Sequence, residues 1–373
     1  KWKLAIGIGG NPRIDEIDAR DLERLKEEIT RAKKKSGLPN DVRISSCYEA
    51  GRDGFWIHRY LLSNGIENIV VDSSSIEVNR RNRRAKTDRI DARKLYTMLV
   101  RHSRGEEGVW SVVRVPSRKD EDERRMHREL ERLKKERGAH NNRIIALLVT
   151  QGIVAKVNRK LPELLENVWL WDGSRLSGQL KLEILRQYTR MQEVDRQIEE
   201  IRQEQRNMLK EAAKEEKEVG KIQMVMGLVG LRGIGEKSAW QMVYEFLWRD
   251  FKNRREVASA AGLVGTPYDS GGSIREQGIS KAGNKRIRRL MVEISWYWLR
   301  YQPDSAITKW FNERFAQGGK RMRRIGIVGV ARRLLIALWK YVRFGEVPEG
   351  STYNERKNGK GVNDWNIFIA PSG

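Results

Sequence analysis

One stretch decides the architecture of the middle of the chain: residues 191–208, MQEVDRQIEEIRQEQRNM. Its apolar residues recur at alternating steps of three and four, with one glutamine in the series: Met191, Val194, Ile198, Ile201, Gln205 and Met208. This is the heptad pattern of a coiled coil. A helix cannot bury such a stripe alone. The sequence therefore predicts a helix over residues 180–218 that pairs with residues 118–148, with another copy of the chain, or with both.

The segment before this helix supplies a suitable partner. Residues 118–148 are highly charged, and they carry an apolar edge of leucine and isoleucine: Leu130, Leu133, Ile144, Ile145, Leu147 and Leu148. Residues 150–178 then read as a connection. We expect residues 116–220 to form a coiled-coil domain.

The first part of the chain alternates strand and helix patterns. Short apolar or alternating runs predict strands at 2–8, 42–48 and 69–71, and amphipathic runs predict helices at 19–32 and 55–62. This rhythm is typical of an α/β domain with parallel strands, which we place at residues 1–115. Glu49 directly follows the second strand, at the edge where open α/β sheets hold their sites.

Two aspartates stand three residues apart in Lys86-Thr87-Asp88-Arg89-Ile90-Asp91-Ala92-Arg93, before a predicted helix at residues 92–101. If both lie on that helix, their carboxylates share one face. Paired carboxylates repel unless a cation lies between them, and Mg²⁺ is the usual cation where the substrate is a phosphate ester. The alternative is a solvated helix face with local Arg–Asp pairs.

The charge of the chain identifies its class of partner. The 373 residues carry a formal charge of +24, which predicts a polyanionic binding partner, above all nucleic acid. No apolar run reaches the roughly 18 residues of a membrane span. The single cysteine, Cys47, excludes a disulfide framework and a cysteine zinc site, and it fits a reducing cytoplasm.

Several basic residues lie close in sequence to the two aspartates. We expect them to hold a phosphate backbone, although a solvated charge run has the same composition; they are Arg80, Arg81, Arg83, Arg84, Lys86 and Arg89. Further along, residues 231–239 (LRGIGEKSA) resemble a helix–hairpin–helix. Its glycines permit a tight turn, and Lys237 follows that turn. Phosphate contact and plain packing both remain open for it.

A second constellation lies in the predicted C-terminal domain, residues 221–347, which reads as mainly α-helical. A glycine-rich segment with serines, residues 268–273 (YDSGGS), precedes a run of polar and basic residues on a predicted helix: Lys281, Asn284, Lys285, Arg286, Arg288 and Arg289. This pattern suits close approach to a phosphate. The alternative is a surface hairpin. Residues 348–373 read as a loose basic tail.

Together these segments resemble the DEDD transposases of insertion sequences, a group of bridge-RNA-guided recombinases. The match extends to about residue 345, and three motifs carry it: Cys47-Tyr48-Glu49-Ala50-Gly51; Lys86-Thr87-Asp88-Arg89-Ile90-Asp91-Ala92; and Tyr268-Asp269-Ser270-Gly271 with Gly278-Ile279-Ser280-Lys281 and Gly283-Asn284-x-x-Ile287-Arg288.

The resemblance implies a ribonuclease-H-like, resolvase-like first domain in which four acids bind Mg²⁺. Glu49, Asp88 and Asp91 match three of them, and the fourth is expected before Lys1, because residues 1–8 contain no acid. It also implies a serine nucleophile, for which Ser270 is the best match and Ser273 and Ser280 are alternatives. The expected product is a phosphoserine link to DNA with a free 3′ hydroxyl, so strands can be rejoined without ATP.

The resemblance further implies a structured noncoding guide RNA that pairs with donor and target DNA, and a tetramer assembled through the coiled coil. Two other functions fit the residues. One is a metal-dependent, junction-resolving nuclease that uses water as its nucleophile. The other is a non-catalytic scaffold that binds nucleic acid.

Overall fold

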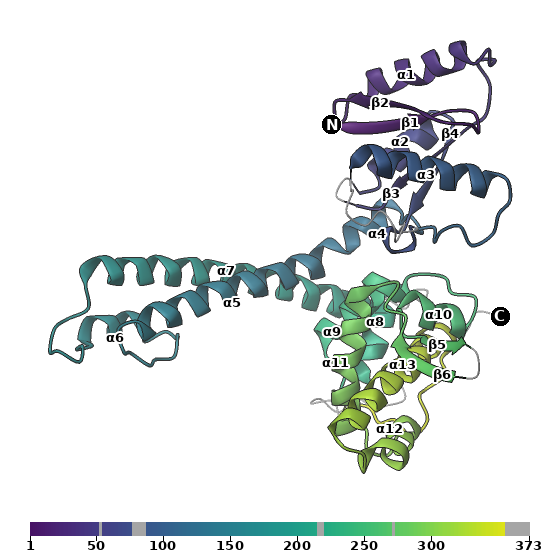
Figure 1. Ribbon diagram of the computed structural model, residues 1–373. Coiled ribbons are helices and arrows are strands. Elements are labelled where there is room, and N and C mark those ends of the chain that lie inside the picture. Colours follow the sequence, from purple (N-terminus) through teal and green to yellow (C-terminus); the bar gives the residue numbers. More distant parts are fainter. Residues whose placement is uncertain (52–53, 77–86, 215–219, 271–272, 355–373) are drawn as a thin grey trace. The chain divides into compact units, whose positions relative to one another are not determined.

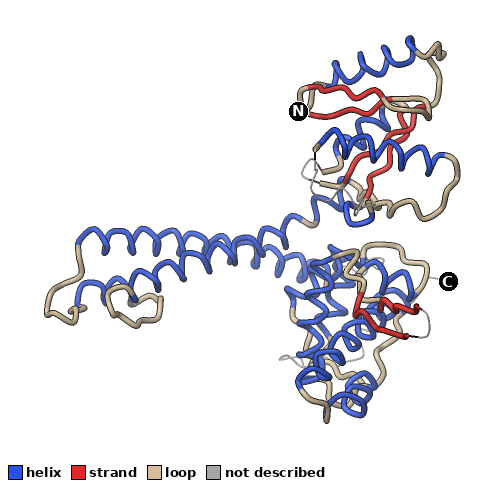
Figure 2. The backbone as a smooth tube through the Cα atoms, viewed as in Figure 1, coloured by secondary structure: helices blue, strands red, loops and turns tan. Residues whose placement is uncertain are grey.

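The computed structural model describes residues 1–51, 54–76, 87–214, 220–270 and 273–354 (Figure 1). The chain is mixed α/β, with small sheets and long helices (Figure 2). It divides into two compact units, Lys1–Ser117 and Arg118–Gly373. The finer division into four segments stays a prediction.

Unit 1 begins with an antiparallel pair of strands, β1 (Trp2–Ile6) and β2 (Arg13–Ile17), in which Trp2 lies opposite Ile17. Strand β2 was not predicted from the sequence, because three of its five residues are charged. Helix α1 (Leu22–Lys35) follows, and the Asp21 side chain caps it by accepting from the Arg24 amide.

The second half of unit 1 is a parallel pair of strands with helices between and after them: β3 (Ile44–Glu49), α2 (Trp56–Ser63), β4 (Ile66–Val71), the 3₁₀ turn η1 (Ser73–Ser75) and α3 (Asp88–Ser103). The register runs from Ile44 opposite Ile66 to Glu49 opposite Val71. The predicted parallel pairing is therefore confirmed for these two strands. The ribonuclease-H-like assignment stays a prediction.

Unit 2 begins with a helical hairpin, formed by α4 (Arg118–Glu123), α5 (Arg125–Val149), α6 (Leu161–Asn167) and α7 (Gly178–Ala212). Figure 1 shows α5 and α7 side by side. Leu130 and Leu133 of α5 are buried with Val194 and Ile198 of α7. The predicted pairing with residues 118–148 of the same chain is thus confirmed.

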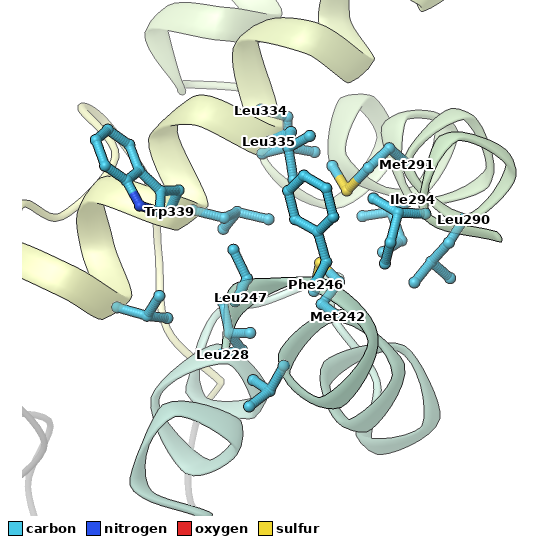
Figure 3. Packing of buried hydrophobic residues seen from close by; sticks show 14 of the residues in the cluster. Leu228, Met242, Phe246, Leu247, Leu290, Met291, Ile294, Leu334, Leu335 and Trp339 are labelled. Atoms are coloured by element: carbon cyan, nitrogen blue, oxygen red, sulfur yellow. The ribbon is translucent and has the colours of Figure 1, made fainter. Parts of the chain in front are cut away.

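The rest of unit 2 is mainly helical around one large core. Its elements are α8 (Lys221–Gly230), α9 (Glu236–Met242), the π-helical turn η3 (Val243–Leu247), α10 (Arg254–Ala260), β5 (Gly265–Ser270), β6 (Ser273–Ile279), α11 (Lys285–Tyr301), α12 (Ala306–Phe311), the π-helical turn η4 (Asn312–Ala316) and α13 (Lys320–Phe344). Figure 3 shows side chains of η3, α11 and α13, such as Phe246, Met291 and Leu335, meeting in this core.

Among the described helices, none has both the length and the apolar character needed to cross a membrane.

Candidate active site and nucleic-acid interface

The three predicted acids of unit 1 come from two elements. Glu49 is the last residue of β3, and its side chain is exposed. Asp88 and Asp91 lie in the first turn of α3, which begins four residues earlier than the sequence predicted. Thr87 caps this helix by accepting from the Ile90 amide at 3.3 Å. Because both aspartates lie on α3, the structure supports the shared face inferred from their spacing.

These carboxylates have the donor chemistry that Mg²⁺ prefers, namely hard oxygen ligands. Within the described ranges, however, no three His, Cys, Asp or Glu side chains are gathered in a way that could hold a metal ion. The aspartate pair on α3 and Glu49 at the end of β3 are therefore not gathered into one metal site in the described residues. Binding of Mg²⁺ stays a prediction.

Cys47 lies near this region and is not a reactive group. Its thiol contacts the backbone oxygen of Leu95 at 3.7 Å, which joins β3 to α3. Burial raises the pKa of the Cys47 thiol to about 12. A thiol with so high a pKa is protonated at neutral pH and is a poor nucleophile.

The serine segment of unit 2 forms a two-stranded antiparallel hairpin. Ser270 ends β5 and Ser273 begins β6, and the two residues lie opposite each other in the register. The hairpin that the sequence offered as an alternative is therefore confirmed, and contact with a phosphate stays a prediction. Residues 271–272 lie outside the described residues. Ser280 follows β6 and is exposed, and its amide donates to the Val264 oxygen at 2.8 Å.

Two glycines hold the segment after the hairpin against the end of α10. A Cβ atom at Gly262 would lie 2.0 Å from the Ala282 oxygen, and one at Gly283 would lie 2.2 Å from the Ala260 oxygen. Between them Lys281 has a φ of 57°, in the left-handed region that non-glycine residues rarely adopt. Strain of this kind persists only where the surroundings enforce it.

Three of the predicted nucleic-acid contacts on α11 already have partners within the chain. The Asn284 side chain caps α11 by accepting from the amides of Arg286 and Ile287. Arg286 pairs with Glu131 of α5. Arg288 donates to the Ala261 oxygen at 3.2 Å. These contacts fix the start of α11, so the three side chains have structural roles in addition to any contact with nucleic acid.

The remaining predicted cations of the described residues face solvent. They have no ion pair with any described residue: Arg89, Lys237, Lys281, Lys285 and Arg289. Arg80, Arg81, Arg83, Arg84 and Lys86 lie outside the described residues.

A cluster of three cations near the α5–α7 helical hairpin was not predicted from the sequence. Burial, together with the nearby charges of Arg202 and Lys237, lowers the pKa of Lys134 to about 8. Lys134 comes from α5, Arg202 from α7 and Lys237 from α9. Arg202 also pairs with Glu199 at 3.7 Å, and a phosphate beside these cations would relieve the repulsion that adds to burial in lowering the pKa of Lys134. Only the tertiary structure brings them together, so no sequence pattern could reveal them.

A buried glutamate was also missed. Glu245 of η3 accepts from His127 Nε2 at 2.9 Å and from Arg128 Nε at 2.5 Å and Nη2 at 2.7 Å. Burial alone would raise the pKa of Glu245, but the hydrogen bonds from Arg128 and His127 lower it to about 2. This network fastens α5 to the helical core of unit 2.

Comparison with known proteins places these elements in a family. The sequence model described as "Transposase IS116/IS110/IS902 family" matches residues 228–310. A protein named "Putative transposase y4rJ" from Sinorhizobium fredii is 38% identical over 361 residues, covering 94% of this chain and 91% of that protein. A second, "Putative transposase y4qE" from the same organism, is 27% identical over 305 residues, covering 81% and 70% respectively. The chain therefore belongs to the IS116/IS110/IS902 family of transposases.

Proposed function

We propose that this transposase-family chain breaks and rejoins DNA by attack of the Ser270 hydroxyl on a phosphodiester. The observation that carries the proposal is the family match over residues 228–310, which contains Ser270 at the end of the β5–β6 hairpin. Lys281 and Lys285 follow in the same matched segment and suit the flanking phosphates.

The proposed step exchanges one phosphoester for another. The Ser270 oxygen bonds to phosphorus, the bond from phosphorus to the 3′ oxygen breaks, and the serine proton passes overall to that oxygen. The products are a phosphoserine link and a free 3′ hydroxyl, and the reverse attack rejoins a strand without ATP. A serine hydroxyl is a weak nucleophile at neutral pH and needs activation. We assign Mg²⁺ binding to Glu49, Asp88 and Asp91, where the ion would polarise the phosphate and the hydroxyl.

Substitution of Ser270 tests whether serine is the nucleophile. We expect Ser270→Ala to abolish DNA cleavage and the covalent protein–DNA adduct on a denaturing gel, while it leaves DNA binding intact. Ser273→Ala and Ser280→Ala are the matched controls. Normal cutting and joining by Ser270→Ala would contradict the assignment. Cutting by the unaltered protein without any adduct would indicate water as the nucleophile.

The acids are tested separately. Replacing Glu49, Asp88 and Asp91 together with alanine should abolish cleavage and its dependence on added Mg²⁺. Unchanged products would remove these acids from the mechanism and would favour a scaffold that binds nucleic acid without catalysis.

We also propose a structured noncoding RNA as the guide that pairs with donor and target DNA. The protein would then recognise backbone and shape rather than sequence, which agrees with a charge of +24. The test is to purify the protein from its host and to sequence the bound RNA. One uniform species encoded beside the gene supports the proposal, and the absence of RNA contradicts it. We also propose that four copies of the chain assemble, and sedimentation of the complex tests that number.

A further inference from the structure

Helix α11 carries large aromatic side chains on its solvent face. Its other face is buried in the core of unit 2 through Ile287, Leu290, Met291, Ile294, Ser295 and Trp298. On the solvent face Trp296 is 45% exposed, Tyr297 47% and Tyr301 37%. These three residues form what we term the α11 aromatic face. Single exposed apolar residues are ordinary, but neighbouring exposed aromatic side chains mark an interaction surface.

Two of these rings are aligned with each other. Tyr297 and Tyr301 are one helical turn apart, and their rings are nearly parallel, with an interplanar angle of 11° and centroids 6.5 Å apart. The Arg300 guanidinium lies 5.4 Å from the Tyr301 ring centroid. Successive bases of a strand are also near-parallel planes, so bases stacked on these rings would keep the geometry of a strand.

The surface is held in place by the turn between α8 and α9. Gln302 is fully buried, and its amide nitrogen donates to the backbone oxygens of Arg232 and Thr352, each at 2.8 Å. Gly233 has a φ of +90°, and a Cβ atom there would lie 3.3 Å from the Tyr301 Cβ. The turn therefore rests against the base of the Tyr301 side chain and against the backbone of Tyr297. Such preorganisation lowers the entropic cost of binding.

Exposed cations outnumber exposed acids on α11 and on the neighbouring turn. The exposed cations of α11 and of the turn are Arg232, Lys285, Arg286, Arg289 and Arg300; Arg286 pairs with Glu131, and the other four have no ion pair with a described residue. Glu293 is the exposed acid of α11. An occupant that carries negative charge and offers flat surfaces for stacking therefore suits this surface. A nucleic-acid strand with unpaired bases supplies both, because its phosphates meet the cations while its bases meet the rings.

We propose that the α11 aromatic face and the neighbouring turn bind unpaired nucleotides, with bases stacked on Tyr297, Tyr301 and Trp296. Base-paired duplex covers the faces of its bases, so this surface selects single-stranded segments. The inference rests on the proposed function and deepens it, because it names the form of nucleic acid that unit 2 holds.

The test measures equilibrium binding and requires no cleavage, so it stands apart from the serine mechanism. Full-length protein carrying Ser270→Ala is titrated into fluorescein-labelled single strands of about 12 nucleotides, one of thymidine and one of uridine, and into an abasic strand with the same phosphates. Tyr297→Ala and Tyr301→Ala should each weaken binding to the base-carrying strands about tenfold. Tyr→Phe at either position should bind as the parent does. The tighter of the two strands shows whether the site takes DNA or RNA.

Two further readings separate stacking from charge. The abasic strand should bind more weakly and with equal affinity to the parent and to both alanine variants. The salt dependence of binding should not change in Tyr297→Ala, whereas Arg300→Gln should reduce its slope by about one. Alanine at 301 retains the Cβ that packs near Gly233, and at 297 the turn meets only the backbone, so both tyrosine variants should fold. Trp171→Ala is the matched control, because Trp171 is 91% exposed outside this face.

Three results would overturn the proposal. One is full affinity of both tyrosine variants for the base-carrying strands. Another is equal affinity of the parent for abasic and base-carrying strands. The third is a change of sedimentation coefficient in Tyr297→Ala without nucleic acid, which would assign the face to contact between copies of the chain.

Discussion

Glu245→Ala is expected to loosen the attachment of the helical hairpin to the core of unit 2. The Glu245 side chain is 2% exposed and accepts hydrogen bonds from two residues of α5, His127 and Arg128. Alanine removes all of these acceptors. His127 then stays buried, with a side chain only 5% exposed, while Arg128, at 44%, can regain water.

Two independent estimates of the stability lost in Glu245→Ala agree. Removing one partner of a buried ion pair costs about 3–5 kcal/mol, and partial hydration of Arg128 places this case at the low end. The pKa of Glu245 falls from 4.5 to about 2, which corresponds to about 3 kcal/mol of interaction with the charged carboxylate. We therefore expect Glu245→Ala to lower the free energy of unfolding of unit 2 by about 3 kcal/mol. Glu245→Gln, which keeps one acceptor oxygen, should lose less.

Urea denaturation followed by circular dichroism measures this loss. Because folding depresses the pKa of Glu245, its contribution is complete above pH 4.5 and disappears as the pH falls towards 2. The difference between the unaltered protein and Glu245→Ala should therefore shrink over that range. A loss at neutral pH below about 1 kcal/mol, or a difference independent of pH, would refute the assignment of this network.

Four further changes have defined outcomes. Ile198→Ala should destabilise the hairpin by about 2–4 kcal/mol in urea denaturation, because Ile198 is buried in the seam. Gly138→Ala should stabilise α5 by about 1 kcal/mol in the same assay, since nothing lies within 4 Å of the added Cβ. Gly283→Ala should destabilise by about 2 kcal/mol or more, because its φ is +94° and its Cβ would clash with the Ala260 oxygen. Binding of duplex DNA should weaken as the pH rises through about 8, where Lys134 loses its proton; Lys134→Ala should abolish that pH dependence in a filter-binding titration.

The fold could be predicted where a local pattern repeats. The seam from Met191 to Met208 indicated a long paired helix because each turn carries the same signal. Strand β2 (Arg13–Ile17) was missed because its pairing with β1 depends on a partner, not on its own charged sequence. A hairpin at residues 268–273 was one of two interpretations of the sequence, but the register of β5 and β6 depends on the pairing of both strands and could not be predicted.

The candidate site could be predicted only as residue types. Asp88 and Asp91 share α3, as their spacing implied. The sequence could not show that Asn284 caps α11 or that Arg286 pairs with Glu131, because those partners are fixed by tertiary packing. It could not reveal the surroundings of Lys134 either, since its neighbouring charges come from α7 and α9.

The closure of the α5–α7 seam within one chain limits how copies of the protein can assemble. Leu133 and Ile198 are already in contact with each other's helices, so they are not available to a neighbouring subunit. Any larger complex that uses the α5–α7 hairpin must contact its solvent-facing side chains, so subunits could join or leave without separating the two helices. Exchange of partners between copies of the chain would then require no unfolding of the α5–α7 pair.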